Sequence, residues 1–293
     1  MILVVGATGL LGLEVCRRLG EKGRRVRALV RQSSDAAKVS HLEDFGVETR
    51  HGDLKDRASL QGACEGVRSI VSTASSTLSR QAGDSIRSVD EEGQLRLVEV
   101  ARATGVDHFV FVSFRDDARI QYPLTRAKRA VERALVDSGM AYTILRASYF
   151  MEVWLSPALG FDVAGGTARV YGDGTGRISW VSYEDVARVA VAALDEPRAR
   201  NAVLEVGGPE PLGPLEVVSI FETLGAPKMH LEHVPVATLH ARMAAASDPL
   251  EESFTGLMLQ YAAGDAVDTR PVAELFPGPS KSVRDYAAAQ LAR

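Results

Sequence analysis

The sequence predicts an α/β fold, with a doubly wound parallel sheet and a smaller C-terminal lobe. Two patterns carry this prediction: short β-branched runs alternate with amphipathic helical stretches through about the first 150 residues, and this alternation stops after Leu145. Strands that alternate with helices form βαβ units, and right-handed crossovers then give a parallel sheet buried on both faces. We expect a first domain at residues 1–150 and a smaller, mainly helical substrate lobe at 151–293.

Six short runs rich in Val and Ile are the expected strands of the first domain, at residues 2–5, 26–30, 47–50, 69–73, 108–112 and 142–145. Each is followed by a helical pattern, as at residues 10–19, where Leu11, Val15 and Leu19 share one face. Further on, the glycine-rich stretch 165–182 predicts a hairpin that leads into a helix beginning near Tyr183. We expect strands near 178–207 to rejoin the large sheet.

Composition excludes several classes of protein. The net charge of −4 gives no electrostatic case for binding nucleic acid or an anionic membrane. No run of eighteen apolar residues is present, so we expect no membrane span, and the start of the chain lacks the basic region of a signal peptide. The two cysteines indicate a reduced, cytoplasmic protein. His230 and His233 lack further ligands at suitable spacing, so no metal site is predicted.

The first strand-to-helix turn, "VVGATGLLG", has the spacing G-x-x-G-x-x-G. Glycine allows the chain to turn sharply, lets a pyrophosphate approach the backbone, and permits close helix–strand packing, as in Rossmann-type dinucleotide sites. The phosphates then lie at a helix N-terminus, which favours negative charge. The alternative is a tight turn without a ligand. The expected cofactor-binding residues of this turn are Gly6, Thr8, Gly9, Leu10, Leu11 and Gly12.

Arg31 determines the expected choice between NADP and NAD. Sites that prefer NAD place an acidic residue about twenty residues after the glycines, whereas here that position is Arg31 and no carboxylate follows until Asp35. An arginine can pair bidentately with a 2′-phosphate. We therefore expect NADPH to be preferred over NADH; the alternative is a solvated surface arginine.

With these residues placed, the chain resembles the atypical short-chain dehydrogenases/reductases, and within them the NmrA-like family. The resemblance rests on "GATGLLG", Gly52–Asp53, "AYTILRASYFME" from Ala141 to Glu152, and "EEGQLRLVEVARATGVDHFVFVS" from Glu91 to Ser113. It covers about the first 205 residues well and the C-terminal lobe only loosely.

The resemblance implies further cofactor contacts. Asp53 with Leu54 would contact the adenine, although "GDLKD" is also a good turn sequence in which Asp53 is a cap. Phe150 would close over the nicotinamide, or else be a core residue. The remaining implied contacts are Thr73, Ala74 and Ser75 along the ribose and pyrophosphate, Ser113 and Phe114 beside the nicotinamide, and Tyr149 over it.

The stretch "YPLTRAKRAVERAL" lacks half of the usual catalytic pair of short-chain dehydrogenases, Y-x-x-x-K. The lysine is Lys128, but Leu124 stands where the tyrosine belongs, and no other lysine of the chain has a tyrosine four residues before it. Tyr122 is a poor substitute, because residues six apart on a helix differ by about 120°. By resemblance, Lys128 would lie beside the nicotinamide ribose or act in proton transfer; alternatively it forms an exposed i, i+4 ion pair with Glu132.

Two functions remain open. One is an NADP(H)-preferring oxidoreductase of NmrA-like type that transfers hydride to a small carbonyl or quinone. The other is a non-catalytic NADP(H)-binding redox sensor or an assembly or regulatory protein, with a redox partner in place of a substrate. A sugar-nucleotide epimerase is excluded, because that chemistry needs the missing tyrosine. The sequence does not predict an oligomeric state.

Overall fold

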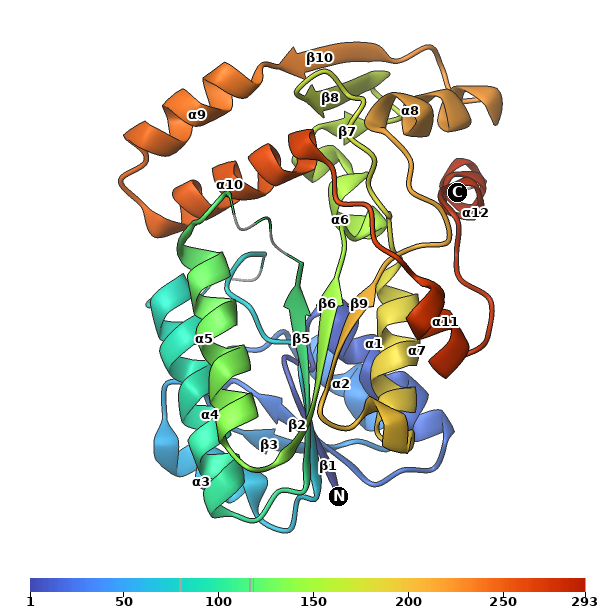
Figure 1. Ribbon diagram of the computed structural model, residues 1–293. Coiled ribbons are helices and arrows are strands. Elements are labelled where there is room, and N and C mark those ends of the chain that lie inside the picture. Colours follow the sequence, from blue (N-terminus) through green and yellow to red (C-terminus); the bar gives the residue numbers. More distant parts are fainter. Residues whose placement is uncertain (79–80, 116, 118, 293) are drawn as a thin grey trace. The chain divides into compact units, whose positions relative to one another are not determined.

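The computed structural model describes residues 1–78, 81–115, 117 and 119–292 (Figure 1). The chain forms two compact units. Unit 1 comprises Met1–Ser113, Pro123–Arg146 and Val186–Leu204. Unit 2 comprises Phe114–Tyr122, Ala147–Asp185 and Glu205–Arg293.

Unit 1 is built on a seven-stranded sheet with the strand order β3-β2-β1-β4-β5-β6-β9. The pairs β1–β2, β1–β4, β2–β3 and β4–β5 are parallel, and Ile2 lies opposite both Val26 and Ser69. This arrangement confirms the predicted doubly wound fold. The strands are β1 (Ile2–Val5), β2 (Val26–Val30), β3 (Glu48–His51), β4 (Ser69–Ser72), β5 (His108–Phe114), β6 (Ala141–Ala147) and β9 (Ala202–Val206).

Helices cover both faces of this sheet. Helices α1, α2 and α7 lie on one side of it and α3, α4 and α5 on the other (Figure 1). A short π-helix, η1, leads directly into α4. The bounds are α1 (Leu10–Glu21), α2 (Ala36–Asp44), α3 (Arg57–Cys64), η1 (Ile86–Glu91), α4 (Glu92–Ala103), α5 (Pro123–Asp137), α7 (Tyr183–Ala193) and the 3-10 turn η3 (Pro197–Ala199).

The inner strands of unit 1 are largely apolar because both of their faces are covered, whereas β3, at one edge of the sheet, is mostly exposed. All four residues of β1 are buried, and β5 is buried from His108 to Ser113. Strands covered by helices on both faces are continuous apolar runs rather than alternating ones. The runs found in the sequence therefore locate the six expected strands to within about two residues.

Unit 2 contains a three-stranded sheet in the order β10-β8-β7. Strand β8 pairs antiparallel with β7 and parallel with β10. An aromatic and aliphatic core, which includes Trp180, Phe221 and Tyr261, underlies this sheet and its helices. The bounds are α6 (Met151–Trp154), η2 (Pro157–Leu159), β7 (Phe161–Asp162), β8 (Thr167–Tyr171), α8 (Pro214–Thr223), β10 (His230–Val234), α9 (Val236–Ala245), α10 (Pro249–Ala263), α11 (Arg270–Leu275) and α12 (Val283–Leu291).

The hairpin predicted at 165–182 is wrong in its pairing, although the helix that follows does begin at Tyr183. Strand β8 forms its hairpin with the preceding β7, not with the segment after it. Gly172 and Gly174 both have positive φ and turn the chain away from β8, and Ile178 then makes only isolated bridges to Leu212 and Asp265. The glycines therefore end one strand without returning the chain alongside it.

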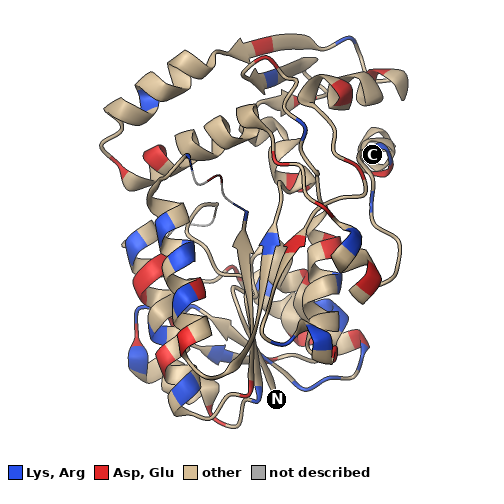
Figure 2. Cartoon of the chain, viewed as in Figure 1, with Lys and Arg blue, Asp and Glu red and all other residues tan. Residues whose placement is uncertain are grey.

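Charged residues of both signs are interspersed on the helices and loops, whereas the strands of the large sheet carry few (Figure 2). This distribution is that expected when a sheet is enclosed between layers of helix. None of the helices in the described part of the chain is both long and apolar enough to span a membrane.

His108, at the start of β5, is a buried neutral histidine. Its Nε2 lies 2.9 Å from Oγ1 of Thr143. The Thr143 hydroxyl donates its proton to the carbonyl of Ala199, so toward His108 it acts as an acceptor. Nε2 of His108 is therefore the protonated nitrogen. Nδ1 has no hydrogen-bond partner among the described residues. Burial lowers the pKa of His108 to about 4, and the positive charge of Arg200 acts in the same direction.

This histidine makes the protein less stable in mild acid. Between its ordinary pKa of 6.5 and about 4, the unfolded chain binds a proton that the native His108 does not, so the free energy of unfolding falls as pH decreases through this range. We expect His108→Gln, which keeps a donor for Thr143 but cannot titrate, to lower the slope of the free energy of unfolding against pH. The reduction corresponds to at most one bound proton. Urea unfolding at several pH values between 4 and 7 measures the effect; parallel curves for the two proteins would contradict it.

Candidate functional site

The candidate site of unit 1 begins at the turn between β1 and α1. Gly6 has a φ of +85°, in the left-handed region that favours glycine. Gly9 N donates to the carbonyl of Gly6 at 2.9 Å and closes the turn. The chain then enters α1 with Gly9 as the N-cap residue.

Two of the glycines are required because backbone approaches them closely. A methyl group on Gly6 would lie 2.7 Å from the backbone nitrogen of Ala74. On Gly12 it would lie 2.1 Å from the carbonyl oxygen of Gly6. Neither neighbour can rotate away, since both are backbone atoms. The sequence spacing therefore reflects real contacts between the first turn of α1, the end of β1 and the segment after β4.

The N-terminus of α1 fits an anionic group. Gly9 provides no side-chain cap, and the N–H groups of Leu10, Leu11 and Gly12 make no hydrogen bond within the described residues. The first N–H groups of a helix lack intrahelical acceptors, and the helix dipole adds positive potential there. Free N–H groups beside glycine backbone are the arrangement that binds a dinucleotide pyrophosphate.

The segment after β4 is held against this turn. Thr73 N donates to the carbonyl of Val5 at 2.9 Å, and Thr73 Oγ1 donates to the same carbonyl at 3.2 Å. Gln94 of α4, fully buried, donates to the carbonyl of Ala74 at 3.1 Å. Thus Thr73 and Ala74, expected beside the cofactor, do lie against the glycine turn; Ser75 follows them and its hydroxyl pairs with that of Thr77 at 3.1 Å.

Lys128 is buried next to a carboxylate. Only 5% of the lysine is exposed, and its Nζ lies 3.7 Å from Oδ1 of Asp90 and 3.5 Å from the carbonyl of Val112. The ammonium also lies 5.0 Å from the centre of the Phe111 ring. Asp90, in η1, accepts from Ser76 N and Oγ with its other oxygen, at 3.0 and 2.7 Å. Its Oδ1 has no hydrogen-bond partner among the described residues.

Burial lowers the pKa of Lys128 below its ordinary value, although the negative charges of Asp90 and Glu132 oppose the shift. The alternative of an exposed ion pair with Glu132 is wrong. Glu132 is itself buried and accepts from Arg129 at 2.9 Å and Arg146 at 2.6 Å. The i, i+4 spacing shows that Lys128 and Glu132 share a face of α5, but not that this face is buried.

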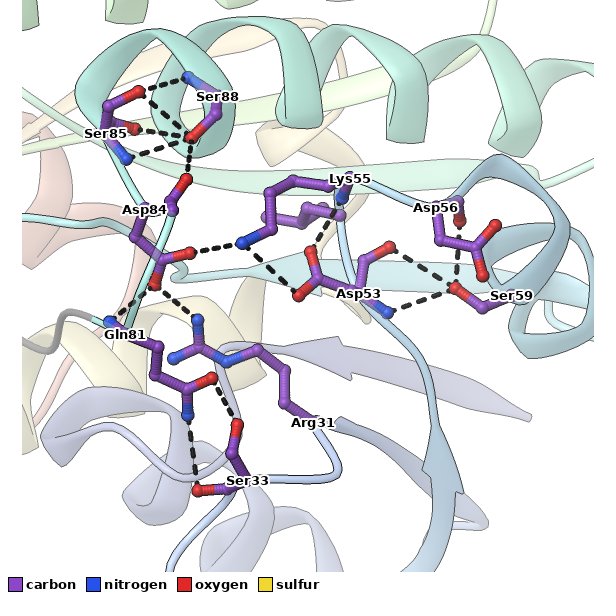
Figure 3. Close-up of polar contacts among 12 residues, drawn as sticks. Arg31, Ser33, Asp53, Lys55, Asp56, Ser59, Gln81, Asp84, Ser85 and Ser88 are labelled. Carbon is purple, nitrogen blue, oxygen red and sulfur yellow. Dashed lines mark hydrogen bonds and ion pairs between the residues drawn. The ribbon is translucent and has the colours of Figure 1, made fainter.

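Arg31, at the end of β2, is paired with Asp84 (Figure 3). The distance from its Nη1 to Oδ2 of Asp84 is 2.5 Å, and Lys55 Nζ reaches Oδ1 of the same carboxylate at 2.7 Å. Burial raises the pKa of Asp84, but hydrogen bonds from Lys55, Arg31 and Gln81 N outweigh it and hold that pKa below its usual range. Arg31 is therefore not the fully solvated arginine of the alternative interpretation; its contact with a cofactor stays a prediction.

The segment after β3 has the geometry of a turn. The carboxylate of Asp53 accepts from Lys55 N at 2.8 Å, as the turn interpretation predicts. Leu54 is buried and belongs to the core of unit 1. The adenine contacts expected of Asp53 and Leu54 remain predictions.

In unit 2, the hydroxyl of Tyr122 forms a hydrogen bond inside the core. Tyr122 is fully buried, and its OH donates to Oε1 of Gln260 at 3.1 Å. Its ring packs on Gly256 of α10, where a methyl group would lie 2.2 Å from the ring, and stacks with Phe114 at 6.2 Å between centroids. The Tyr122 hydroxyl is therefore engaged within the core, and its role as a poor proton donor stays a prediction.

The other expected nicotinamide contacts have structural partners too. Tyr149 is buried among aromatic rings, including Trp154 at 4.9 Å, and its OH donates to the carbonyl of Leu257 at 2.8 Å. Burial raises the pKa of Tyr149 well above its ordinary value. Phe150 is half-buried and bridges to Val181. In unit 1, buried Ser113 accepts from Arg129 at 3.3 Å.

Sequence reasoning missed Asp84, Lys55 and Asp90. Asp90 did carry a signal: it stands in a run of buried positions with Ile86, Val89 and Leu97, and a carboxylate on an apolar helix face needs a partner. Asp84 and Lys55 carried none, because their pairing joins loops that are distant in the chain.

The parallel sheet, the glycine turn and the uncapped helix N-terminus define a Rossmann-type, NAD(P)-binding protein. A model of the NmrA-like family matches residues 1–283, so the chain belongs to that family, and the likeness extends beyond the 205 residues expected from motifs.

Relatives include both reductases and assembly factors. The chain is 33% identical to (4-alkanoyl-5-oxo-2,5-dihydrofuran-3-yl)methyl phosphate reductase of Streptomyces griseus, over 98% of this chain and 97% of the relative. It is 30% identical to the NAD(P)H azoreductase of Xenophilus azovorans, over 100% and 98%. It is 29% identical to the photosystem II assembly factor Ycf39 of Synechocystis, over 81% and 72%.

Among solved structures, the fold matches the NADPH-dependent quinone oxidoreductase QOR2 of Escherichia coli, complexed with NADPH. The TM-score is 0.79 at 22% identity, over 99% of this chain and 100% of that one. At this identity the likeness establishes the fold.

We expect Gly12→Ala to destabilise the protein by about 1–3 kcal/mol, because α1 must move away from Gly6 to accommodate the methyl group. Urea unfolding measures the loss. Gly62→Ala in α3 is the matched control: its methyl group meets only the mobile end of Arg50, at 3.1 Å, and alanine favours helix by about 1 kcal/mol. Equal stability of Gly12→Ala and the unmodified protein would contradict the close contact.

Proposed function

We propose that this protein is an NADP(H)-preferring oxidoreductase that transfers hydride to a small carbonyl or a quinone. The observation that carries the proposal is the glycine turn, where backbone packs on Gly6 and Gly12 while the N–H groups of Leu10 to Gly12 find no acceptor in the described part of the chain. These N–H groups suit the pyrophosphate of a dinucleotide.

The other residues extend the cofactor site along unit 1. Arg31 offers a guanidinium to a 2′-phosphate, and the segment of Thr73, Ala74 and Ser75 would follow the ribose and pyrophosphate. Lys128 would contact the nicotinamide ribose. When bound, NADPH supplies a hydride from C4 of its nicotinamide.

The reduction also needs a proton, and Lys128 is the residue proposed to provide it. Burial makes its ammonium more acidic than an exposed lysine, which suits proton donation near neutral pH. Carbonyl reduction needs this proton at the substrate oxygen as the alcohol forms. A quinone can accept hydride and take its proton from solvent, so quinone reduction is compatible with the missing tyrosine. The names of the quinone oxidoreductase and azoreductase relatives support a reductase.

The second candidate function is a non-catalytic NADP(H)-binding sensor or assembly protein. Two observations favour it: the Y-x-x-x-K tyrosine is absent, and relatives of similar identity are named photosystem II assembly factors. In this case the same site binds NADP(H) without turnover, and a partner protein responds to the bound cofactor.

The two cysteines support the proposed cytoplasmic location. Cys16 and Cys64 are both free and buried, as in proteins of reducing compartments. Burial raises the pKa of each thiol, to about 12 and about 11, so neither is a reactive thiolate.

We expect NADPH to bind at least about tenfold more tightly than NADH, and Arg31→Ala to remove that difference, because a charge-assisted hydrogen bond contributes about 1.5–3 kcal/mol. Fluorescence titration of each cofactor gives the dissociation constants. Arg24→Ala, at the other end of β2, is the control and should keep the preference. Equal affinities of the unmodified protein for both cofactors would refute the preference.

We expect NADPH to be oxidised with a quinone or an aldehyde from a small panel, and Lys128→Met to slow aldehyde reduction by about a hundredfold or more while slowing quinone reduction less. Absorbance at the nicotinamide band measures both rates, with exposed Lys22→Met as the control. An unchanged rate of aldehyde reduction in Lys128→Met would show that Lys128 is not the proton donor. Tight NADPH binding with no turnover on any substrate would favour the sensor.

A further inference from the structure

Two cations at the end of β2 and after β3 already share one carboxylate. Arg31 and Lys55 contact different oxygens of Asp84, at 2.5 and 2.7 Å (Figure 3). The Asp84 side chain is 1% exposed, whereas those of Arg31 and Lys55 are 27% and 34% exposed. The carboxylate is thus enclosed, and both cations keep a face toward solvent.

Asp84 is held in this position by its own segment. Its Oδ2 also accepts from Gln81 N at 3.0 Å. The Gln81 side chain donates to the carbonyl of Ser33 at 3.3 Å and accepts from its hydroxyl, which ties the segment to the turn after β2. On the other side, Ser85 and Ser88 form a capping box that begins η1. The carboxylate is therefore fixed by contacts on both sides.

The charges of the cluster cancel. Asp53 Oδ2 lies 3.8 Å from Lys55 Nζ, so two cations, Arg31 and Lys55, face two carboxylates, Asp53 and Asp84. A phosphate monoester carries a charge of about −1.5 to −2 at neutral pH. Such a group is attracted by both cations and repelled by Asp84. An uncharged ribose hydroxyl has only weak electrostatic interactions with any of these charges.

We propose that Asp84 is a specificity-determining residue that competes with the 2′-phosphate of NADP(H) for Arg31 and Lys55. The inference rests on the proposed cofactor function. The two cations alone would give a stronger preference for NADPH over NADH. The negative charge of Asp84 reduces that preference. Lys55 is the second cation of the 2′-phosphate site, next to Arg31.

Asp84→Asn tests the competition, because it keeps the shape of the side chain and removes its charge. We expect the dissociation constant of NADPH to decrease about tenfold while that of NADH changes less than twofold, both measured by titration at fixed ionic strength. Asp195→Asn is the matched control: it removes one negative charge from an exposed pair with Arg24, at the opposite end of β2. A weaker binding of NADPH in Asp84→Asn would overturn the proposal and make Asp84 a residue that positions the cations.

Lys55→Met provides a second test that keeps the charge of Asp84, although it removes the Lys55 hydrogen bond to Asp84 Oδ1. We expect NADPH binding to weaken about five- to tenfold and NADH binding to stay unchanged, because Asp84 then neutralises Arg31 alone. An unchanged NADPH affinity would overturn the role of Lys55.

The two proposals fail in different ways. If the unmodified protein prefers NADPH and Asp84→Asn leaves the affinity ratio unchanged, the competition is refuted and the cofactor preference stands. If the unmodified protein shows no preference but Asp84→Asn acquires one, the preference is refuted and the competition stands.

Discussion

Close packing of backbone on Gly6 is the constraint on which the rest of the candidate site depends. The end of β1 can approach the segment after β4 only because Gly6 has no side chain, and α1 can approach that turn only because Gly12 has none. The same segment continues to Ser76, which binds Asp90, and Asp90 in turn faces Lys128. A continuous series of contacts therefore runs from the glycine turn to the lysine, within one unit of the chain.

The pair of Lys128 and Asp90 is not explained by stability. Removing two charges from water costs several kcal/mol per ion, and this is recovered only when geometry and additional hydrogen bonds are good. Here the charged atoms are 3.7 Å apart and Asp90 Oδ1 has no hydrogen bond among the described residues. Apolar residues of similar volume would stabilise the fold at least as well. A buried, imperfectly paired lysine favours the proposed role of Lys128 in cofactor binding or proton transfer.

The fold followed from the sequence because apolar runs and glycines report local requirements. The strands of unit 1 were located from β-branched residues, and the glycine turn from its spacing. The pairing of β8 with β7 could not be predicted, because glycines show where a chain turns but not which strand it joins. The partners of Arg31 and Lys128 were not found either, because Asp84 and Asp90 reach them only through the crossovers of the sheet. Long-range ion pairs leave no periodic pattern in a single sequence.

The π-helix η1 gives the segment between Asp84 and Asp90 a fixed length. Asp84 neutralises cations that follow β2 and β3, and Asp90 faces a lysine on α5, so one short segment is anchored at both ends. Loss of one residue from η1 would shift the register of the helix by about 100° and so change the direction of Asp90 relative to Asp84. Substitutions at outward positions such as Arg87, whose side chain is 82% exposed, leave both anchors in place. Within this segment, insertions and deletions are therefore more damaging than substitutions at outward positions.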